Sequence, residues 1–158
     1  MKHFKNFKTC VYCTAQTLAS LDETTLARDY AYLEKYVGID KVYLETYRDG
    51  TWVSIDHMKM IQNFFKEHGV EIAGGITTVT PPLEKDDVKR QRLFQTFCYS
   101  NEAMRTYLKK IVTYTAELFD EIILDDFFFT SCTCDDCLRE RSNLSWAEFR
   151  SKKMIDVA

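Results

Sequence analysis

Apolar and polar residues follow two different periods along this chain. Four short runs are rich in β-branched and aromatic residues and are bounded by turn residues or charges, as buried strands are. They cover residues 9–14, 41–47, 70–79 and 122–124. The third run contains Gly74-Gly75, which predicts a bulge or a close approach by another backbone. Between the runs, apolar residues recur every three or four positions, which is typical of helices with one buried face.

Polar residues mark the starts of the predicted helices. The helical stripes cover residues 26–37, 58–65 and 104–119. Side chains that can accept a hydrogen bond from the first turn precede these stripes. They are Asp22 or Thr24, Ser54 or Asp56, and Ser100. Ser145 and Glu148 form a capping box, so a fourth helix is expected to begin there. Residues 15–22 and the charged stretch 80–99 are predicted to be loops.

The alternation of strands and helices predicts an α/β fold with a parallel sheet and right-handed crossovers. A complete eight-stranded barrel needs about 250 residues, whereas this chain has 158. We therefore expect residues 1–158 to form a single domain, the parallel (β/α)4 half of a TIM barrel. An isolated half leaves two strand edges unpaired. The chain is thus expected to be a fragment or to pair with a second half-barrel as a homo-oligomer. A small doubly wound α/β domain is the alternative.

The amino-acid composition and the net charge limit the classes of partner that this chain is expected to bind. The chain is 46% hydrophobic and 14% aromatic, which is enough for a packed core. Its net charge of −3, with acids and bases interspersed, argues against a nucleic-acid surface. No apolar run approaches the roughly 18 residues that cross a bilayer. The basic N-terminus lacks an apolar signal core. We expect a cytoplasmic protein, or a periplasmic or secreted one if an export signal has been removed.

Two adjacent carboxylates, Asp125 and Asp126, directly follow the apolar run 122–124. We interpret this run as a strand that is buried on both faces. Ligands of parallel α/β proteins bind beyond the carboxyl ends of the strands. The pair is therefore a candidate for acid/base or nucleophilic catalysis, as in glycoside cleavage. In the alternative, one carboxylate caps the following loop and the other pairs with a cation.

The end of the second predicted strand carries Glu45, Tyr47 and Arg48. A carboxylate at this position can hold substrate hydroxyls, or it can form a structural ion pair with Arg48. Aromatic rings near the strand ends can stack on the apolar face of a sugar. The candidates are Tyr12, Tyr47, Trp52, Phe127, Phe128 and Phe129. The alternative for each ring is a place in the core or in the wall of a pocket.

Three thiols lie within six residues at Cys132, Cys134 and Cys137. Structural zinc sites are tetrahedral and favour thiolates, so three cysteines leave one position to fill. Cys98 is the natural fourth ligand, because it ends the loop after the third strand and loops on one edge of a parallel sheet are neighbours. The alternatives are reduced surface thiols, or one disulfide and a spare thiol.

Residues 124–129, the cysteines from Cys132 to Cys137, and the pattern Trp146-x-x-Phe149-Arg150 together resemble the strand-four region of barrel glycoside hydrolases. The resemblance is greatest to the family 42 β-galactosidases and to uncharacterised glycosyl hydrolases related to them, and it covers residues 98–150. In that family a similar cysteine cluster, with one upstream cysteine, holds structural zinc. The resemblance thus implies a carbohydrate substrate and a zinc site at Cys98 and the three later cysteines.

The same family ends its fourth strand with an Asn-Glu pair, whose Glu is the acid/base. Asp125-Asp126 takes that place here, and the shorter side chain changes the reach to the glycosidic oxygen. An Asp at the end of strand four also resembles the nucleophile position of the α-galactosidase and α-glucosidase group. A second carboxylate would come from a later strand, so we expect this chain alone to have little or no activity. The alternatives are a non-catalytic carbohydrate-binding module and a zinc-stabilised interaction domain.

Overall fold

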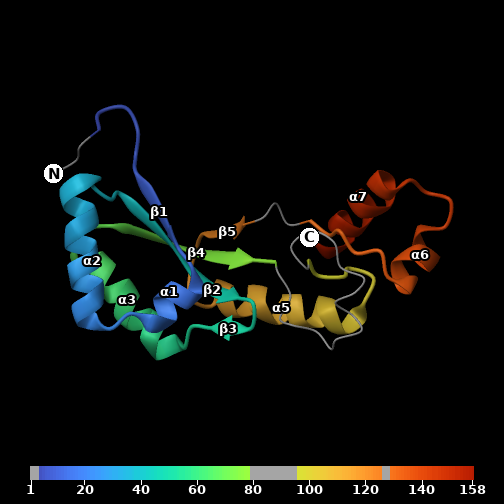
Figure 1. Cartoon of the computed structure of the whole chain (residues 1–158), viewed down its shortest axis with the longest axis horizontal. Helices are drawn as coiled ribbons and strands as arrows, with labels where there is room; N and C mark the ends of the chain where they lie inside the picture. Colours follow the sequence, from blue (N-terminus) through green and yellow to red (C-terminus); the bar gives the residue numbers. More distant parts are fainter. Residues whose placement is uncertain (1–3, 79–95, 126–128) are drawn as a thin grey trace.

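The computed structural model describes residues 4–78, 96–125 and 129–158. Its centre is a sheet with the strand order β1-β2-β4-β5, and all pairs along this path are parallel (Figure 1). These strands are β1 (Cys10–Cys13), β2 (Lys41–Arg48), β4 (Glu71–Thr77) and β5 (Ile122–Asp125). A short strand, β3 (Thr51–Trp52), pairs antiparallel with β2. The expected parallel α/β fold is confirmed.

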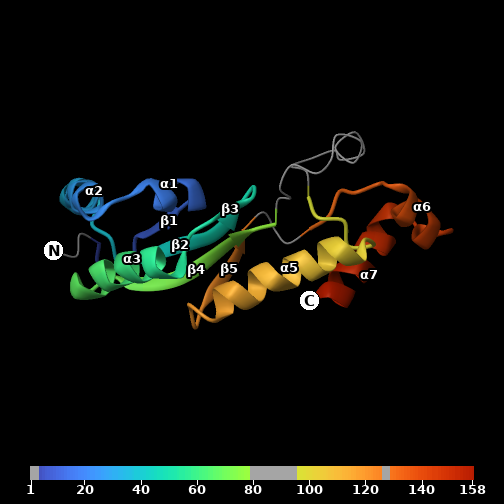
Figure 2. The same cartoon turned by 90° about the horizontal axis from the view of Figure 1, so that it is seen from below.

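Helices alternate with the strands of this sheet. They are α1 (Ala15–Ser20), α2 (Glu23–Tyr36), α3 (Ile55–Glu67), α5 (Glu102–Ala116), α6 (Asp135–Arg141) and α7 (Trp146–Val157). Helix α5 packs against β4 and β2 and runs alongside β4 in both views (Figures 1 and 2). Helices α6 and α7 lie beyond the carboxyl ends of these strands (Figure 1). Among the helices of the described residues, none has the length and apolar content to cross a membrane.

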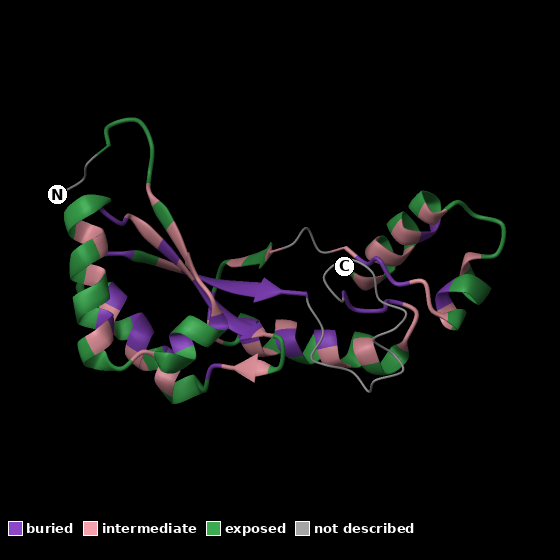
Figure 3. Ribbon diagram, in the orientation of Figure 1, coloured by how far each residue is buried: buried purple, intermediate pink, exposed green. Residues whose placement is uncertain are grey.

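Two apolar clusters hold the helices to the sheet. The first contains Leu44 of β2 together with Met58 and Ile61 of α3, all fully buried. The second lies nearer the carboxyl ends of the strands and joins Ile76 of β4 to Ile111 of α5. Figure 3 shows that burial is concentrated along β2 and β4. The central strands are therefore the best-buried elements next to the side chains at their carboxyl ends.

Local sequence signals located most helix starts correctly. Side chains cap the helices as expected at Asp22, Ser54 and Ser145. The expected cap at Ser100 is wrong by one residue. Asn101 caps α5 by accepting a hydrogen bond from the Met104 amide at 3.0 Å. The Ser100 hydroxyl instead donates to Glu140 at 3.0 Å, and this long-range contact leaves no trace in the local sequence.

Residues 15–22, which we expected to be a loop, contain helix α1. Thr14 caps it, because its side chain accepts a hydrogen bond from the Thr17 amide. Ala15 and Leu18 are fully buried and form the inner side of the helix. Two apolar positions are too few to reveal a helical period, which explains why the sequence pattern did not predict α1.

A tight hairpin joins β2 to β3. The sequence predicted a turn at residues 48–50, and the structure has Tyr47 paired with Trp52 across a loop centred on Asp49 and Gly50. Both loop residues have positive φ, 47° for Asp49 and 81° for Gly50. Asp-Gly with two positive φ angles is the favoured chemistry for a two-residue hairpin loop. The hairpin folds back directly beside Arg48.

Strand β5 is not buried on both faces, and that expectation is wrong. Ile123 and Leu124 are each 37% exposed. Among the described residues, β5 pairs with β4 on one side and with no strand on the other. The apolar run therefore forms a sheet edge with exposed side chains, which the sequence pattern alone cannot distinguish from a central strand.

The two glycines in β4 allow close approach by side chains, rather than by the backbone that we expected. A Cβ atom added at Gly74 would lie 2.8 Å from side-chain carbons of Phe119 and Thr115. On the opposite face, a Cβ at Gly75 would lie 2.8 Å from the hydroxyl of Tyr12. The register irregularity occurs instead on β2, between Glu45 and Tyr47, where it pairs with β4.

Candidate functional site

A polar network at the carboxyl ends of the strands is centred on Glu45. This carboxylate is fully buried and accepts five hydrogen bonds from four residues. The donors are the Tyr12 hydroxyl (2.8 Å), the Ala15 amide (2.7 Å), Arg48 Nε (2.8 and 3.1 Å) and the Thr77 hydroxyl (2.5 Å). Such a set of donors offsets the cost of burying the charge. Glu45 thus connects β1, β2, β4 and α1.

Arg48 is the cation of this network. Its Nε binds Glu45, and its Nη2 donates to Thr77 Oγ1 at 2.7 Å. The same Nη2 lies 3.4 Å from Asp125 Oδ2. The hydrogen bond to Glu45 raises the pKa of Arg48 above its usual value. The structural ion pair that we considered as an alternative role for Glu45 is therefore present, and it continues to Asp125 on the next strand but one.

Asp125 ends β5 and faces the network with 42% of its side chain exposed. It is a carboxylate at the strand ends that both contacts a cation and reaches solvent. Asp126, Phe127 and Phe128, which are also candidates on this segment, lie outside the described residues. The catalytic roles of Asp125 and Asp126 stay predictions.

The two candidate tyrosines occupy different environments. Tyr12 is partly buried beside Glu45, and burial together with the charge of Glu45 raises the pKa of its phenol. Tyr47 is fully buried and packs edge-on against Trp52 and Tyr107. Tyr47 therefore offers no ring face to a ligand in this structure, whereas Tyr12 lies at the strand ends.

Sequence reasoning missed Thr77, which takes part in the network through its hydroxyl. Thr77 is fully buried, donates to Glu45 and accepts from Arg48. A signal for it exists, because Thr77 directly follows the buried Ile76 at the end of a strand, as Asp125 follows Leu124. The Ala15 amide was also missed, since a backbone donor has no side-chain signature.

Four cysteine side chains converge beyond the sheet, as the sequence predicted for Cys98 and the three later cysteines. All four Sγ atoms lie within 4.8 Å of one another. The separations are 3.6 Å for Cys98–Cys134, 3.5 Å for Cys98–Cys137 and 3.7 Å for Cys134–Cys137. All six cysteines lie in the described part of the chain, and none forms a disulfide.

Hydrogen bonds between two distant segments bring Cys98 to the other thiols. The Thr130 hydroxyl donates to the Phe97 carbonyl at 2.7 Å, and the Ser131 amide donates to the Thr96 hydroxyl at 2.8 Å. The cluster packs against Phe149 of α7. Three of its cysteines are buried, so it is enclosed rather than spread over a surface loop.

The thiol geometry fits a tetrahedral metal ion. A zinc ion with Zn–S distances of about 2.3 Å separates its sulfur ligands by about 3.8 Å, close to the separations found here. Hydrogen bonds from Cys137 and Cys98 hold the pKa of Cys132 well below its usual value, and the same contacts with Cys132 raise the pKa of Cys98 and of Cys137. Cys132 is therefore the thiol of the group that most readily forms a thiolate. Thiolate is the form of cysteine that binds metal.

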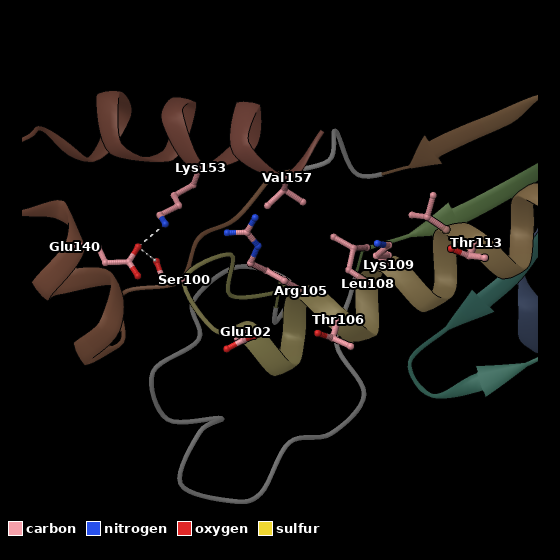
Figure 4. A pocket seen from close by; sticks show the side chains of 11 residues that line it. Ser100, Glu102, Arg105, Thr106, Leu108, Lys109, Thr113, Glu140, Lys153 and Val157 are labelled. Atoms are coloured by element: carbon pink, nitrogen blue, oxygen red, sulfur yellow. Dashed lines mark hydrogen bonds and ion pairs between the residues drawn. The ribbon is translucent and has the colours of Figure 1, made fainter.

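A cavity of about 830 Å³ lies between α5 and the two C-terminal helices (Figure 4). Arg105 and Leu108 of α5 face Val157 of α7 across it. At one end, Glu140 of α6 pairs with Lys153 of α7. The cavity is lined by other residues than the Glu45 network, so it does not contain the candidate carboxylate Asp125.

Comparison with known families places the whole chain, residues 1–158, in the family described as "probable glycosyl hydrolase, catalytic domain". The chain belongs to this family. A relative from Saccharolobus solfataricus, described as an uncharacterised protein, is 35% identical over 130 residues, which are 81% of this chain and 21% of the relative.

The fold resembles a crystal structure of a β-galactosidase from the psychrophilic Marinomonas ef1. The TM-score is 0.51, with 16% sequence identity over 73% of this chain and 20% of the β-galactosidase chain. This likeness concerns the fold. The glycosyl hydrolase family member described here thus spans about a fifth of the length of both proteins.

Proposed function

We propose that the protein containing this chain hydrolyses O-glycosidic bonds, with Asp125 and Asp126 as its strand-end carboxylates. The membership of residues 1–158 in a family of probable glycosyl hydrolase catalytic domains carries this proposal. The position of Asp125 supports it. This carboxylate ends a parallel strand, reaches solvent and contacts Arg48, and such strand ends are where β/α proteins place their reactive groups.

The chain described here supplies one side of the reaction. Glycosidases normally place two carboxyl groups on either side of the scissile bond, about 5–5.5 Å apart in retaining enzymes and 6.5–9.5 Å apart in inverting ones. Asp125 and Asp126 are neighbours in sequence and cannot flank a sugar from opposite sides. The second carboxylate is expected from another part of the protein, so residues 1–158 alone should have little or no hydrolase activity.

The charges near Asp125 favour a carbohydrate without negative groups. Glu45 and Asp125 contribute two negative charges and Arg48 contributes one positive charge, which leaves this part of the site with a charge of −1. A uronic acid or sulfated sugar would add repulsion at short range. Neutral sugars avoid this repulsion, and their hydroxyls can donate to Asp125 and accept from Arg48.

The test is turnover of a panel of neutral aryl glycosides by the full-length protein. Asp125→Asn and Asp126→Asn should lower kcat by at least 10²-fold for a general acid/base, on the order of the usual contribution of such groups. Asp29→Asn is the control, because Asp29 lies on α2 and pairs with the exposed Arg28. Wild-type turnover in both active-site variants would exclude this assignment. Sugar binding without turnover by the wild-type protein would favour a carbohydrate-binding module.

We also propose that Cys98, Cys132, Cys134 and Cys137 hold a structural zinc ion. Their sulfur separations and their burial support this ligand set. A site closed by four thiolates leaves no position for substrate, so zinc here would stabilise the fold rather than catalyse. It would fix the segment before α5 against the loop that follows β5.

A further inference from the structure

Glu45 has no free hydrogen-bond acceptor position for a substrate. Its two oxygens accept five hydrogen bonds from the protein, and its side chain is fully buried. A carboxylate has about four lone-pair sites, so a sugar hydroxyl would have to displace a donor from the chain. The substrate-binding role expected for Glu45 from the sequence does not fit this environment.

We propose that Glu45 is a positioning residue, which fixes the guanidinium of Arg48 beside Asp125 so that Arg48 and Asp125 together hold a sugar hydroxyl. This inference rests on the proposed glycosidase function, because it assigns roles within the same site. It moves the contact with substrate from the buried carboxylate to the partly exposed cation that the carboxylate orients.

Three contacts fix the orientation of Arg48. Nε is bound to both oxygens of Glu45, and Nη2 is bound to the Thr77 hydroxyl. Thr77 is held in turn, because its own hydroxyl donates to Glu45 at 2.5 Å. The planar guanidinium is therefore held along one edge by groups on two strands. The side chain of Tyr12 also interacts with the guanidinium, and the Arg48 side chain remains 24% exposed.

Distance and burial show which of the two carboxylates forms the stronger ion pair with Arg48. Nε lies 2.8 Å from Glu45, which is fully buried, whereas Nη2 lies 3.4 Å from Asp125, which is 42% exposed. Ion pairs strengthen with burial and weaken with exposure. The tighter pair is therefore Glu45–Arg48. Asp125 keeps only a long contact through Oδ2, and within the described residues its Oδ1 has no hydrogen-bond partner.

The result is a hydrogen-bond donor beside a hydrogen-bond acceptor at the carboxyl ends of the strands. Arg48 Nη1 can donate and Asp125 Oδ1 can accept, and a sugar hydroxyl needs both. Loss of Glu45 would leave Arg48 free to close on Asp125 as a simple ion pair. The expected consequence is loss of the productive geometry, which costs about 10²-fold in rate for a displacement of about 1 Å.

The first experiment is a double-mutant cycle in the full-length protein with neutral aryl glycosides. Glu45→Gln and Arg48→Met should each lower kcat/KM about 10²-fold, and the double variant should be no worse than Arg48→Met alone, because Glu45 acts through Arg48. Additive losses would overturn the proposal, as would wild-type activity in Glu45→Gln. Glu121→Gln is the matched control, since Glu121 pairs with Lys41 at the opposite ends of the strands.

Chemical rescue separates positioning from a general loss of structure. Guanidinium ion added to Arg48→Ala should restore part of the activity, because Glu45 and Thr77 form a ready site for it. The same addition should restore nothing in Arg48→Ala/Glu45→Gln. Equal rescue of both variants, or of neither, would contradict the role of Glu45.

A measurement without turnover keeps the inference independent of the proposed activity. An NMR spectrum of the wild-type protein should show a slowly exchanging Nε–H signal for Arg48 that is lost in Glu45→Gln and moved in Asp125→Asn. Persistence of the signal in Glu45→Gln would refute the positioning role. An absence of wild-type turnover, with the NMR result as expected, would count against the glycosidase function alone.

Discussion

The Sγ atoms of Cys98 and Cys137 lie 3.5 Å apart, although 39 positions separate the two residues in the chain. Their contact joins the segment that precedes α5 to the third position of α6. Hydrogen bonds between residues 96–97 and residues 130–131 support the same junction. The junction places the cysteine cluster beyond the sheet, on the side to which the strand ends point (Figure 1).

The purified protein should contain one tightly bound zinc ion. Cys134→Ser removes one of four ligands and should lower the metal content measured by elemental analysis to near zero. Cys10→Ser should leave it unchanged, because Cys10 is exposed on β1. Chelation should lower Tm by on the order of 10 °C, since a metal bound only by the native state stabilises it by several kcal/mol. The site would be refuted if protein purified without chelator contained no metal and its Tm did not change when a chelator was added.

Gly75→Ala should destabilise the protein by about 1–3 kcal/mol, the usual cost of overpacking. The added methyl group would lie 2.8 Å from the Tyr12 hydroxyl and 2.9 Å from its ring, so either the ring or β4 must move. Urea unfolding measures the loss of stability. In a Tyr12→Ala background the same substitution should cost less, because the obstructing ring is gone. An equal cost in both backgrounds would locate the strain elsewhere.

Stability should fall as the pH drops below about 4. Hydrogen bonds lower the pKa of Asp22 at the start of α2 and of Glu148 at the start of α7, and Lys153 lowers the pKa of Glu140. The unfolded chain then takes up protons at a higher pH than the folded chain. The stabilisation is therefore present above the ordinary pKa values and is lost as pH falls through the lowered ones.

Thermal unfolding between pH 7 and pH 3 tests this dependence. Glu148→Gln should have a shallower acid slope, because the residue no longer titrates. Glu67→Gln is the control, as Glu67 is exposed at the end of α3. The same acid slope in wild type and Glu148→Gln would show that the capping box does not contribute.

Residues 1–158, prepared alone, should self-associate through the open edge of β5. Ile123 and Leu124 expose 37% of their surface beside a strand side that is unpaired among the described residues, and such edges recruit further strands. Leu124→Lys should shift the sedimentation profile toward monomer. Ile155→Lys is the matched control, because Ile155 is 74% exposed on α7. A monomeric wild-type chain would argue against pairing of half-barrels through this edge.

Local chemistry explains what the sequence could predict. Asp22, Ser54 and Ser145 act on amides within their own first helical turn, so a short window contains the whole interaction. The link from Cys98 to the later cysteines was also predictable, because neighbouring parallel strands deliver their loops to one edge. In each case the deciding feature was either adjacent in sequence or fixed by the strand order.

Tertiary contacts explain what the sequence could not predict. The exposure of Leu124 depends on which strands lie beside β5, and the apolar run is the same in either setting. The acceptor positions of Glu45 are filled because the Thr77 hydroxyl and the Ala15 amide, which belong to other elements, donate hydrogen bonds to it. The sequence around Glu45 does not indicate that its carboxylate oxygens already accept hydrogen bonds from distant residues.

The lack of side chains at Gly74 and Gly75 of β4 has a consequence for the sequences of relatives. Phe119 packs against one side of this strand and Tyr12 against the other, each in space that a methyl group would fill. Tyr12 also donates to Glu45, so the size of residue 75 is tied to the strand-end network. Relatives with a side chain at position 75 should carry a smaller residue at position 12, and the two positions should covary.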